Sequence, residues 1–250
     1  FRSYKKTLGL QFSDMIEIPR VDLIWASSRE IKCILSAMEE AMKYEWDYFH
    51  YITENDMPLK SQQWIDIFFE ANKGSEFISY TPQWYKFANY KCQVYHICID
   101  NPKYRKQKIL HYIDHGWARI QYVLGFRRSK KKFYHGSGYF SVSREFVNYV
   151  LSNKENIIKD YSKTLCGLEV FMQTICYYSK FRSNIYMFES KYDGNLRYID
   201  WDRRVGNSPH TFTLDDWDDI VDKMDNSNLC FIRKIADQEL VDKIYERVKE

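Results

Sequence analysis

The feature that most constrains the fold is the alternation of strand-like and helix-like segments in the first third of the chain. Residues 21–25, 47–52 and 76–80 are short apolar runs rich in β-branched and aromatic residues, as in buried strands. A helical pattern follows the first of them, and Ser27 with Glu30 has the spacing of a capping box at its start. Such alternation is typical of an α/β fold, in which helices cover both faces of a sheet.

Capping signals continue through the rest of the chain. Ser61 and Ser143 are each placed to cap a helix, and Thr213 with Asp216 forms a second capping box. No internal repeat, low-complexity tract or linker interrupts the pattern. We therefore expect one domain over residues 1–250.

Periodicity predicts the remaining elements. Helices are expected over residues 102–124 and 238–248, and further strands at residues 93–99, 196–199 and 229–232. In the helix at 102–124, helical spacing predicts one apolar face, formed by Ile109, Ile113, Trp117, Ile120 and Leu124.

Composition narrows the function classes. The net charge of +3 is too small to indicate nucleic-acid binding. Aromatic residues make up 18% of the chain, which suits either carbohydrate recognition on flat π-surfaces or a core of large side chains. The basic run at 127–132 could contact phosphate or an anionic membrane surface, although a solvated loop is the simpler explanation. No stretch approaches the ~18 apolar residues that a transmembrane helix needs.

The six cysteines lie far apart, without CxxC pairs or neighbouring His partners. Several stand inside apolar runs, such as Cys33 and Cys230. We therefore expect reduced, buried thiols and a cytoplasmic location.

Three polar positions are candidates for chemistry. Glu169 is expected in the first turn of a helix, where the helix dipole favours the charged form that a general base needs; a structural first-turn Glu is the alternative. Asp56 follows a predicted strand and could bind a sugar or ribose hydroxyl, or it could form an Asx-turn. Arg233 and Lys234 end another strand and could neutralise a diphosphate, or they could face solvent.

Other patterns favour structure over chemistry. The acidic cluster at 215–219 coincides with a capping box, and the Asp200-Trp201-Asp202 segment lies late in the chain, so we expect no metal site in either. No nucleophile elbow, phosphate-binding loop or dinucleotide-binding fingerprint is present. His135 has no evident carboxylate partner in the sequence, and we expect a structural role for it.

Seven blocks, in the same order, resemble the bacterial branch of the core-2/I-branching N-acetylglucosaminyltransferases (glycosyltransferase family 14). Each block alone is weakly specific, but together they extend over most of the chain. They are residues 24–28 (Ile-Trp-Ala-Ser-Ser), 55–61 (Asn-Asp-Met-Pro-Leu-Lys-Ser), 136–147 (beginning Gly-Ser-Gly-Tyr-Phe), 166–169 (Cys-Gly-Leu-Glu), 196–201 (Leu-Arg-Tyr-Ile-Asp-Trp), 208–210 (Ser-Pro-His) and 231–234 (Phe-Ile-Arg-Lys).

The resemblance implies a GT-A-like mixed central sheet and an inverting transfer from a UDP-sugar to a glycan hydroxyl, without a metal or other cofactor. Glu169 would be the base, and Lys234 with Arg233, helped by Arg204, would stabilise the departing diphosphate. Donor binding would also involve Asp56. Ser137 and Tyr139 would line the acceptor site, and the enzyme would build a polysaccharide at the cytoplasmic face of a membrane.

The sequence also departs from the family pattern. Leu168 replaces the usual Asp before the base, and Thr53-Glu54 replaces the usual Ser-Gly before Asp56. The family's first strand, helix and strand, which help to hold the nucleotide, are not recognisable here. Either the chain lacks the first part of its nucleotide site, or this member has lost donor binding and is a non-catalytic carbohydrate-binding relative.

Overall fold

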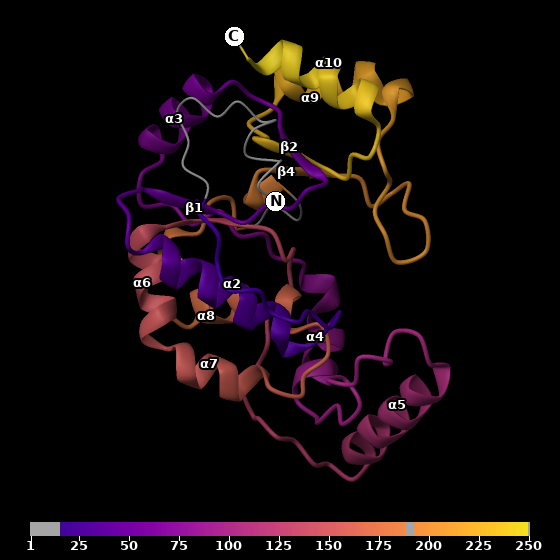
Figure 1. Cartoon of the computed structure of the whole chain (residues 1–250). Coiled ribbons are helices and arrows are strands. Elements are labelled where there is room, and N and C mark those ends of the chain that lie inside the picture. Colours follow the sequence, from indigo (N-terminus) through magenta and orange to yellow (C-terminus); the bar gives the residue numbers. More distant parts are fainter. Residues whose placement is uncertain (1–15, 189–192, 250) are drawn as a thin grey trace.

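The computed structural model describes residues 16–188 and 193–249 (Figure 1). The helices are α2 (Ser28–Ala41), α3 (Gln62–Ala71), α4 (Tyr85–Cys92), α5 (Lys108–Val123), α6 (Arg144–Ser152), α7 (Lys154–Tyr161), α8 (Phe171–Tyr177), α9 (Trp217–Asn226) and α10 (Gln238–Val248). The strands are β1 (Tyr48–His50), β2 (Asp56–Pro58), β3 (Ser141–Ser143), β4 (Arg197–Ile199) and β5 (Phe231–Arg233).

The strands form two small sheets. In the mixed sheet the order is β2-β5-β4, with β2 antiparallel and β4 parallel to β5. In the other sheet β1 pairs antiparallel with β3, which is extended by a bridge between Phe77 and Ser141. The buried Arg197 joins the two sheets, because it extends from β4 and donates hydrogen bonds to the Phe140 carbonyl (2.7 Å) and the Ser141 hydroxyl (2.8 Å).

Helices cover these sheets with apolar faces. Figure 1 shows α2, α6, α7 and α8 gathered on the β1 side and α9 with α10 on the β2 and β4 side. The largest buried cluster includes Leu35, Phe140 and Phe171, and a second cluster packs Ile220 and Ile244 against Ile232 of β5. The predicted α/β fold, with a mixed sheet and helices packed against it, is confirmed. No helix within the described residues has both the length and the apolar character needed to cross a membrane.

Most local predictions are confirmed. Ser61 and Ser143 cap α3 and α6 by accepting hydrogen bonds from the amides of Trp64 and Phe146. Thr213 and Asp216 form the predicted capping box, and α10 has the predicted bounds. All six cysteines are free; Cys92, Cys176 and Cys230 are buried as predicted, whereas Cys33, Cys98 and Cys166 are partly exposed.

Several strand predictions are wrong or too long. Residues 21–25 and 93–99 form no strand, and residues 76–80 make only isolated bridges. In the segment 93–99, the Gln121 side chain occupies the hydrogen-bonding positions of a neighbouring strand. Its amide accepts from the Tyr95 N–H and donates to the Tyr95 carbonyl, both at 2.9 Å.

Helix predictions need three corrections. The helix expected at 102–124 begins at Lys108. Its predicted apolar face is exposed to solvent, while Asp114, Ala118 and Gln121 are buried. Ser27 caps α2 through the Arg29 amide, and Glu30 is not seen to complete the predicted capping box. Glu169 lies in a 3₁₀ turn, Gly167–Glu169, that precedes α8 and is not part of the helix itself.

Candidate active site

The turn that precedes β3 brings Glu169 and His135 together. The Gly136 N–H donates to the Glu169 carbonyl at 2.9 Å, so this turn runs directly over the 3₁₀ turn that carries Glu169. A Cβ at Gly136 would lie only 1.9 Å from the Ser79 carbonyl oxygen, and one at Gly138 would lie 3.0 Å from Leu168. Gly136 is therefore required for the close approach of this turn to the Ser79 backbone, and Gly138 leaves room for the Leu168 side chain.

Ser137 lies in the same turn and stabilises it. Its hydroxyl accepts a hydrogen bond from the Tyr139 N–H at 3.2 Å, its N–H donates to the Ser79 hydroxyl at 3.0 Å, and its carbonyl accepts from Gln173 at 2.6 Å. The predicted acceptor role of Ser137 stays a prediction, and these contacts show that Ser137 also shapes the turn.

Glu169 has a histidine partner that the sequence did not reveal. Its Oε2 lies 3.4 Å from His135 Nε2, and His135 Nδ1 lies 2.6 Å from the Thr81 hydroxyl. Nε2–H can donate toward the carboxylate whether the imidazole is neutral or charged, and the direction of the hydrogen bond between Nδ1 and Thr81 depends on the protonation state. The expectation that His135 has no carboxylate partner is therefore wrong, because the two residues approach only through the fold.

The electrostatic environment keeps Glu169 ionised while leaving it accessible. Burial alone would raise the pKa of Glu169, but the hydrogen bond and charge of His135, together with the Lys91 ammonium, outweigh it and lower the pKa below its ordinary value. The side chain is nevertheless 43% exposed. A charged, reachable carboxylate with an oriented imidazole has the chemical requirements of a general base.

A second carboxylate, Glu30 at the start of α2, faces the same region. Burial raises the pKa of Glu30 to about 7; a hydrogen bond with the Ala26 backbone opposes the shift, and the negative charge of Glu169 adds to it. Two interacting carboxylates with pKa values moved in opposite directions are a common feature of sites that transfer protons.

Three stacked side chains continue the site toward the mixed sheet. The Tyr51 and Tyr139 rings stack with centroids 5.8 Å apart and an interplanar angle of 15°, and the Arg233 guanidinium lies 4.2 Å from the centre of the Tyr139 ring. The Glu30 charge contributes to raising the pKa of both tyrosines. Tyr139 therefore connects the Glu30 and Glu169 region with Arg233 at the end of β5.

Asp56 and Arg233 form a mostly buried ion pair. They are directly opposite in the β2–β5 register, and Arg233 Nη1 lies 2.7 Å from Asp56 Oδ1. The other Asp56 oxygen accepts from the Thr53 N–H at 2.6 Å, and the Asp56 side chain is 3% exposed against 15% for Arg233. In this conformation Asp56 holds Arg233 and the turn at Thr53. The predicted Asx-turn is not formed, because the residue two positions on is Pro58, which has no N–H, and the carboxylate bonds back to Thr53 instead. The donor-binding role of Asp56 stays a prediction.

Lys234 is the freer of the two predicted cations. It follows β5 directly, its carbonyl accepts from the Phe212 N–H at 2.8 Å, and its side chain is half-buried. Its ammonium makes no hydrogen bond or ion pair with the described residues. Arg204 lies in the exposed loop that returns from β4 to Phe212. A half-buried lysine that directly follows Arg233 in the chain is suited to bind phosphate oxygens.

The acidic clusters serve local structure. The Asp200 carboxylate accepts hydrogen bonds from the N–H groups of Asp202 (2.9 Å) and Arg203 (3.0 Å), and Asp216 binds Arg203 and His210. Within the described ranges, no three His, Cys, Asp or Glu side chains are arranged to hold a metal ion.

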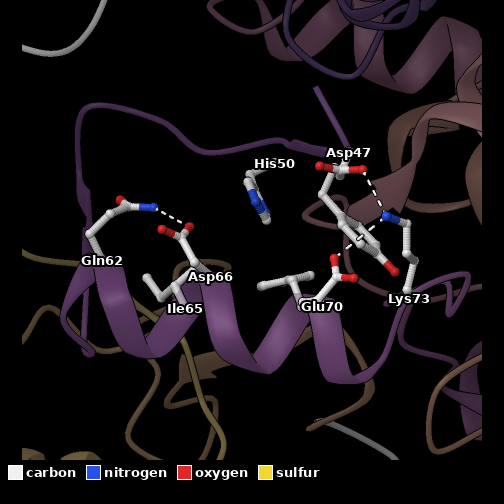
Figure 2. A pocket seen from close by; sticks show the side chains of 9 residues that line it. Asp47, His50, Gln62, Ile65, Asp66, Glu70 and Lys73 are labelled. Atoms are coloured by element: carbon white, nitrogen blue, oxygen red, sulfur yellow. Dashed lines mark hydrogen bonds and ion pairs between the residues drawn. The ribbon is translucent and has the colours of Figure 1, made fainter. Parts of the chain in front are cut away.

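A separate pocket of about 400 Å³ lies between β1 and α3, as Figure 2 shows. Its rim carries a Lys73 ammonium 3.4 Å from Asp47 and 3.5 Å from Glu70, and Gln62 donates to Asp66 at 2.7 Å. Burial and the Arg197 charge lower the pKa of His50, which faces this pocket, to about 3. The predicted site residues do not line this pocket, so it is distinct from the Glu169 region.

The sequence analysis did not identify two residues of the candidate site, His135 and Glu30, as functional. Glu30 was assigned to a capping box on its spacing from Ser27, and His135 was assigned a structural role. Only the resemblance to the family block at 136–147 offered a signal, because it placed the turn beside His135 near the expected base.

Comparison with known proteins defines the class. The family model for the Core-2/I-Branching enzymes matches residues 3–226, and the chain therefore belongs to this family.

Curated relatives in this family are named as glycosyltransferases. The chain is 23% identical to Xylosyltransferase 2 of Canis lupus familiaris over 84% of its own length and 23% of that protein. It is 27% identical to the β-glucuronosyltransferase GlcAT14A of Arabidopsis thaliana, over 80% of this chain and 42% of that protein. Xylosyltransferase 1 of Mus musculus is 24% identical over 86% of this chain and 22% of its own length. The chain thus spans less than half the length of these relatives.

Proposed function

We propose that this protein is an inverting glycosyltransferase that moves a sugar from a UDP-sugar to a hydroxyl of a glycan acceptor. Family membership and the names of its relatives support glycosyl transfer in general. The observation that carries the proposal for this chain is the ionised, accessible Glu169 with His135 beside it. We further propose N-acetylglucosamine or a related hexose as the transferred sugar.

In the proposed reaction, Glu169 accepts the proton of the acceptor hydroxyl while the hydroxyl oxygen attacks the anomeric carbon of the donor. The bond from that carbon to the diphosphate oxygen breaks, its electron pair leaves with UDP, and the configuration inverts. His135 orients the Glu169 carboxylate and keeps it charged before the reaction. Ser137 and the edge of the Tyr139 ring would border the acceptor, because the faces of this ring already contact Tyr51 and Arg233.

Lys234 would stabilise the negative charge that develops on the leaving diphosphate, with help from Arg233, which Asp56 holds in place. Two cations at the end of β5 can supply the charge stabilisation for which other enzymes use a divalent ion, and we propose that this enzyme needs no metal or other cofactor. Loss of a single preorganised charge of this kind costs on the order of 100-fold in rate. We place the enzyme in the cytoplasm, at the inner face of the membrane.

The test is transfer and hydrolysis of UDP-sugars by the full-length protein, with and without EDTA. Glu169→Gln should reduce the rate by at least about 1,000-fold without preventing donor binding, because the general base is lost while the fold is kept. Lys234→Gln should reduce the rate about 100-fold. Lys43→Gln, at a surface lysine just after α2, should leave it unchanged. Full activity of Glu169→Gln, or loss of activity in EDTA that Mg²⁺ or Mn²⁺ restores, would refute the mechanism.

The non-catalytic alternative is distinguished by calorimetry. A carbohydrate-binding relative would bind glycans but not UDP, even at full length, and would show no transfer. UDP binding by the wild type that is weaker in Lys234→Gln would support the proposal that the protein is an enzyme.

A further inference from the structure

Helix α5 is amphipathic, but its polar face packs against the protein and its apolar face is exposed to solvent. The reverse is usual for a helix at the surface of a globular protein. Its buried side chains are Asp114, Ala118 and Gln121. The opposite face carries seven large exposed hydrophobic side chains within the helix and at its C-cap. They are Ile109, Tyr112, Ile113, Trp117, Ile120, Val123 and Leu124. At 100° per residue these seven positions fall within one continuous arc, and therefore form a single apolar face.

Buried polar contacts fix this orientation. Asp114 accepts hydrogen bonds from the Cys98 N–H (2.9 Å) and the Tyr104 hydroxyl (3.2 Å), and its Oδ2 lies 2.7 Å from Nδ1 of the buried His96. Burial alone would raise the pKa of Asp114, but these hydrogen bonds lower it below its ordinary value. Gln121 adds its two bonds to the Tyr95 backbone. Rotation of the helix would break all of these contacts, so the apolar face is held outward.

Positive charge surrounds the apolar face. Residues 101–132 contain ten Lys and Arg residues and one acidic residue, the buried Asp114, which gives this segment a net charge of +9 in a chain whose net charge is +3. Lys103, Arg105, Lys106 and Lys108 precede or begin the helix, and the 127–132 run follows it. Figure 1 shows α5 at the periphery of the molecule, apart from the helices that cover the sheets.

We propose that α5 lies flat in the surface of a membrane that contains anionic lipid, with its apolar face among the acyl chains and the flanking cations at the head groups. An exposed apolar helix face with Trp and Tyr near its edges and Lys and Arg at both ends has the features of an interfacial helix. The charge distribution matches an anionic lipid surface, which supplies an apolar layer bordered by negative charge. This inference goes beyond the proposed catalysis and does not depend on it.

The candidate site lies close to the base of this helix. Ile99 and Tyr104, in the segment before α5, pack with Ala26 and Leu165 in one buried cluster, and Cys166 lies against the same cluster. Ala26 and Cys166 are near Glu30 and Glu169 in the sequence. This cluster therefore joins the segment before α5 to the elements that carry the candidate site.

The test is sedimentation of the full chain with sucrose-loaded vesicles of phosphatidylcholine alone or mixed with phosphatidylglycerol. The double variant Ile109→Glu/Val123→Glu changes two face residues that are 60% and 75% exposed. The matched control is Ile67→Glu on α3, which is 63% exposed and lies outside the proposed face. We expect the wild type and Ile67→Glu to bind the anionic vesicles, and the double variant to bind at least about tenfold more weakly.

Lys130→Gln/Lys132→Gln, or high salt, should weaken binding to the anionic vesicles. Failure of the wild type to bind these vesicles, or equal binding by the double variant, would overturn the proposal. A third outcome would also overturn the proposal: the wild type is a dimer that does not bind vesicles, and the double variant is a monomer. The apolar face would then contact a second copy of the chain. If the double variant does not fold, the test is quenching of tryptophan fluorescence by vesicles that contain brominated lipid. Quenching should be clearly stronger in the wild type than in Trp117→Phe, and equal quenching of the two proteins would overturn the proposal.

Discussion

The burial of Glu30 near Glu169 leads to a quantitative prediction for Glu30→Gln. The pKa of Glu30 rises from 4.5 to about 7 in the folded protein, chiefly because the carboxylate is buried. The folded state therefore binds this proton more tightly than the unfolded state. Stability should fall as the pH rises from about 4.5 to about 7, and the full cost should be present above that range. At about 1.4 kcal/mol per pKa unit, the cost is about 3 kcal/mol.

Gln is similar in size to Glu and cannot ionise, so the variant lacks this cost. We expect the free energy of unfolding of Glu30→Gln to equal that of the wild type near pH 4.5 and to exceed it by up to about 3 kcal/mol near pH 8. The measurement is urea unfolding of both proteins at the two pH values, followed by tryptophan fluorescence and circular dichroism. Other groups that titrate in this range, such as the buried Glu76, cancel in the difference between the two proteins.

The control is Glu39→Gln on an exposed part of the same helix, where the carboxylate lies 2.6 Å from the Lys154 ammonium. A surface pair of this kind contributes less than about 1 kcal/mol at either pH. A difference between Glu30→Gln and the wild type that is the same near pH 4.5 and pH 8 would show that Glu30 ionises normally. The raised pKa of Glu30, which rests chiefly on its burial, would then be refuted.

Three further predictions test the structure around the site. Gly136→Ala should lower the free energy of unfolding by at least about 3 kcal/mol, because the added Cβ would overlap the Ser79 carbonyl. Gly116→Ala is the control: it lies on α5 with open space around it and should raise thermal stability slightly. Arg197→Met should lower the free energy of unfolding in urea by about 3 kcal/mol or more, because the Phe140 carbonyl and the Ser141 hydroxyl lose the arginine donor. The control Arg182→Met, at an exposed contact with Tyr177, should lower it by less than about 1 kcal/mol. Tyr139→Ala should lower kcat/KM for sugar transfer at least about tenfold, and Tyr139→Phe, which keeps the ring between Tyr51 and Arg233, should retain most of it.

The sequence was a good guide where the controlling interaction is local. The Ser61 and Ser143 caps bind amide groups three residues further on, and Thr213 with Asp216 closes on itself, so spacing alone identifies them. Strand limits depend on distant partners. Tyr95 lies in an apolar run typical of a strand, yet its backbone bonds to the Gln121 side chain, which no periodicity could indicate.

The same distinction applies to the candidate site. The resemblance to the family pointed to Glu169, and the strand ends pointed to Asp56, Arg233 and Lys234. The β2–β5 register then places Asp56 opposite Arg233. The partners that control Glu169 come from elsewhere: His135 reaches it through the turn before β3, and Glu30 reaches it from the start of α2. Their effect on ionisation depends on burial and distance, and sequence spacing specifies neither.

Helix α5 shows why an amphipathic pattern can predict a helix and still misassign its faces. Periodicity separates an apolar face from a polar face, but which one packs inward depends on what the neighbouring segment offers. Here residues 95–104 offer backbone amides, His96 and Tyr104, which match Asp114 and Gln121 and not the isoleucines. These contacts account for the polar face completely, but nothing in the described structure accounts for Ile109, Ile113 and Val123. An apolar face that folding leaves in water requires a second apolar phase to explain it, and the surrounding cations indicate a lipid surface as that phase.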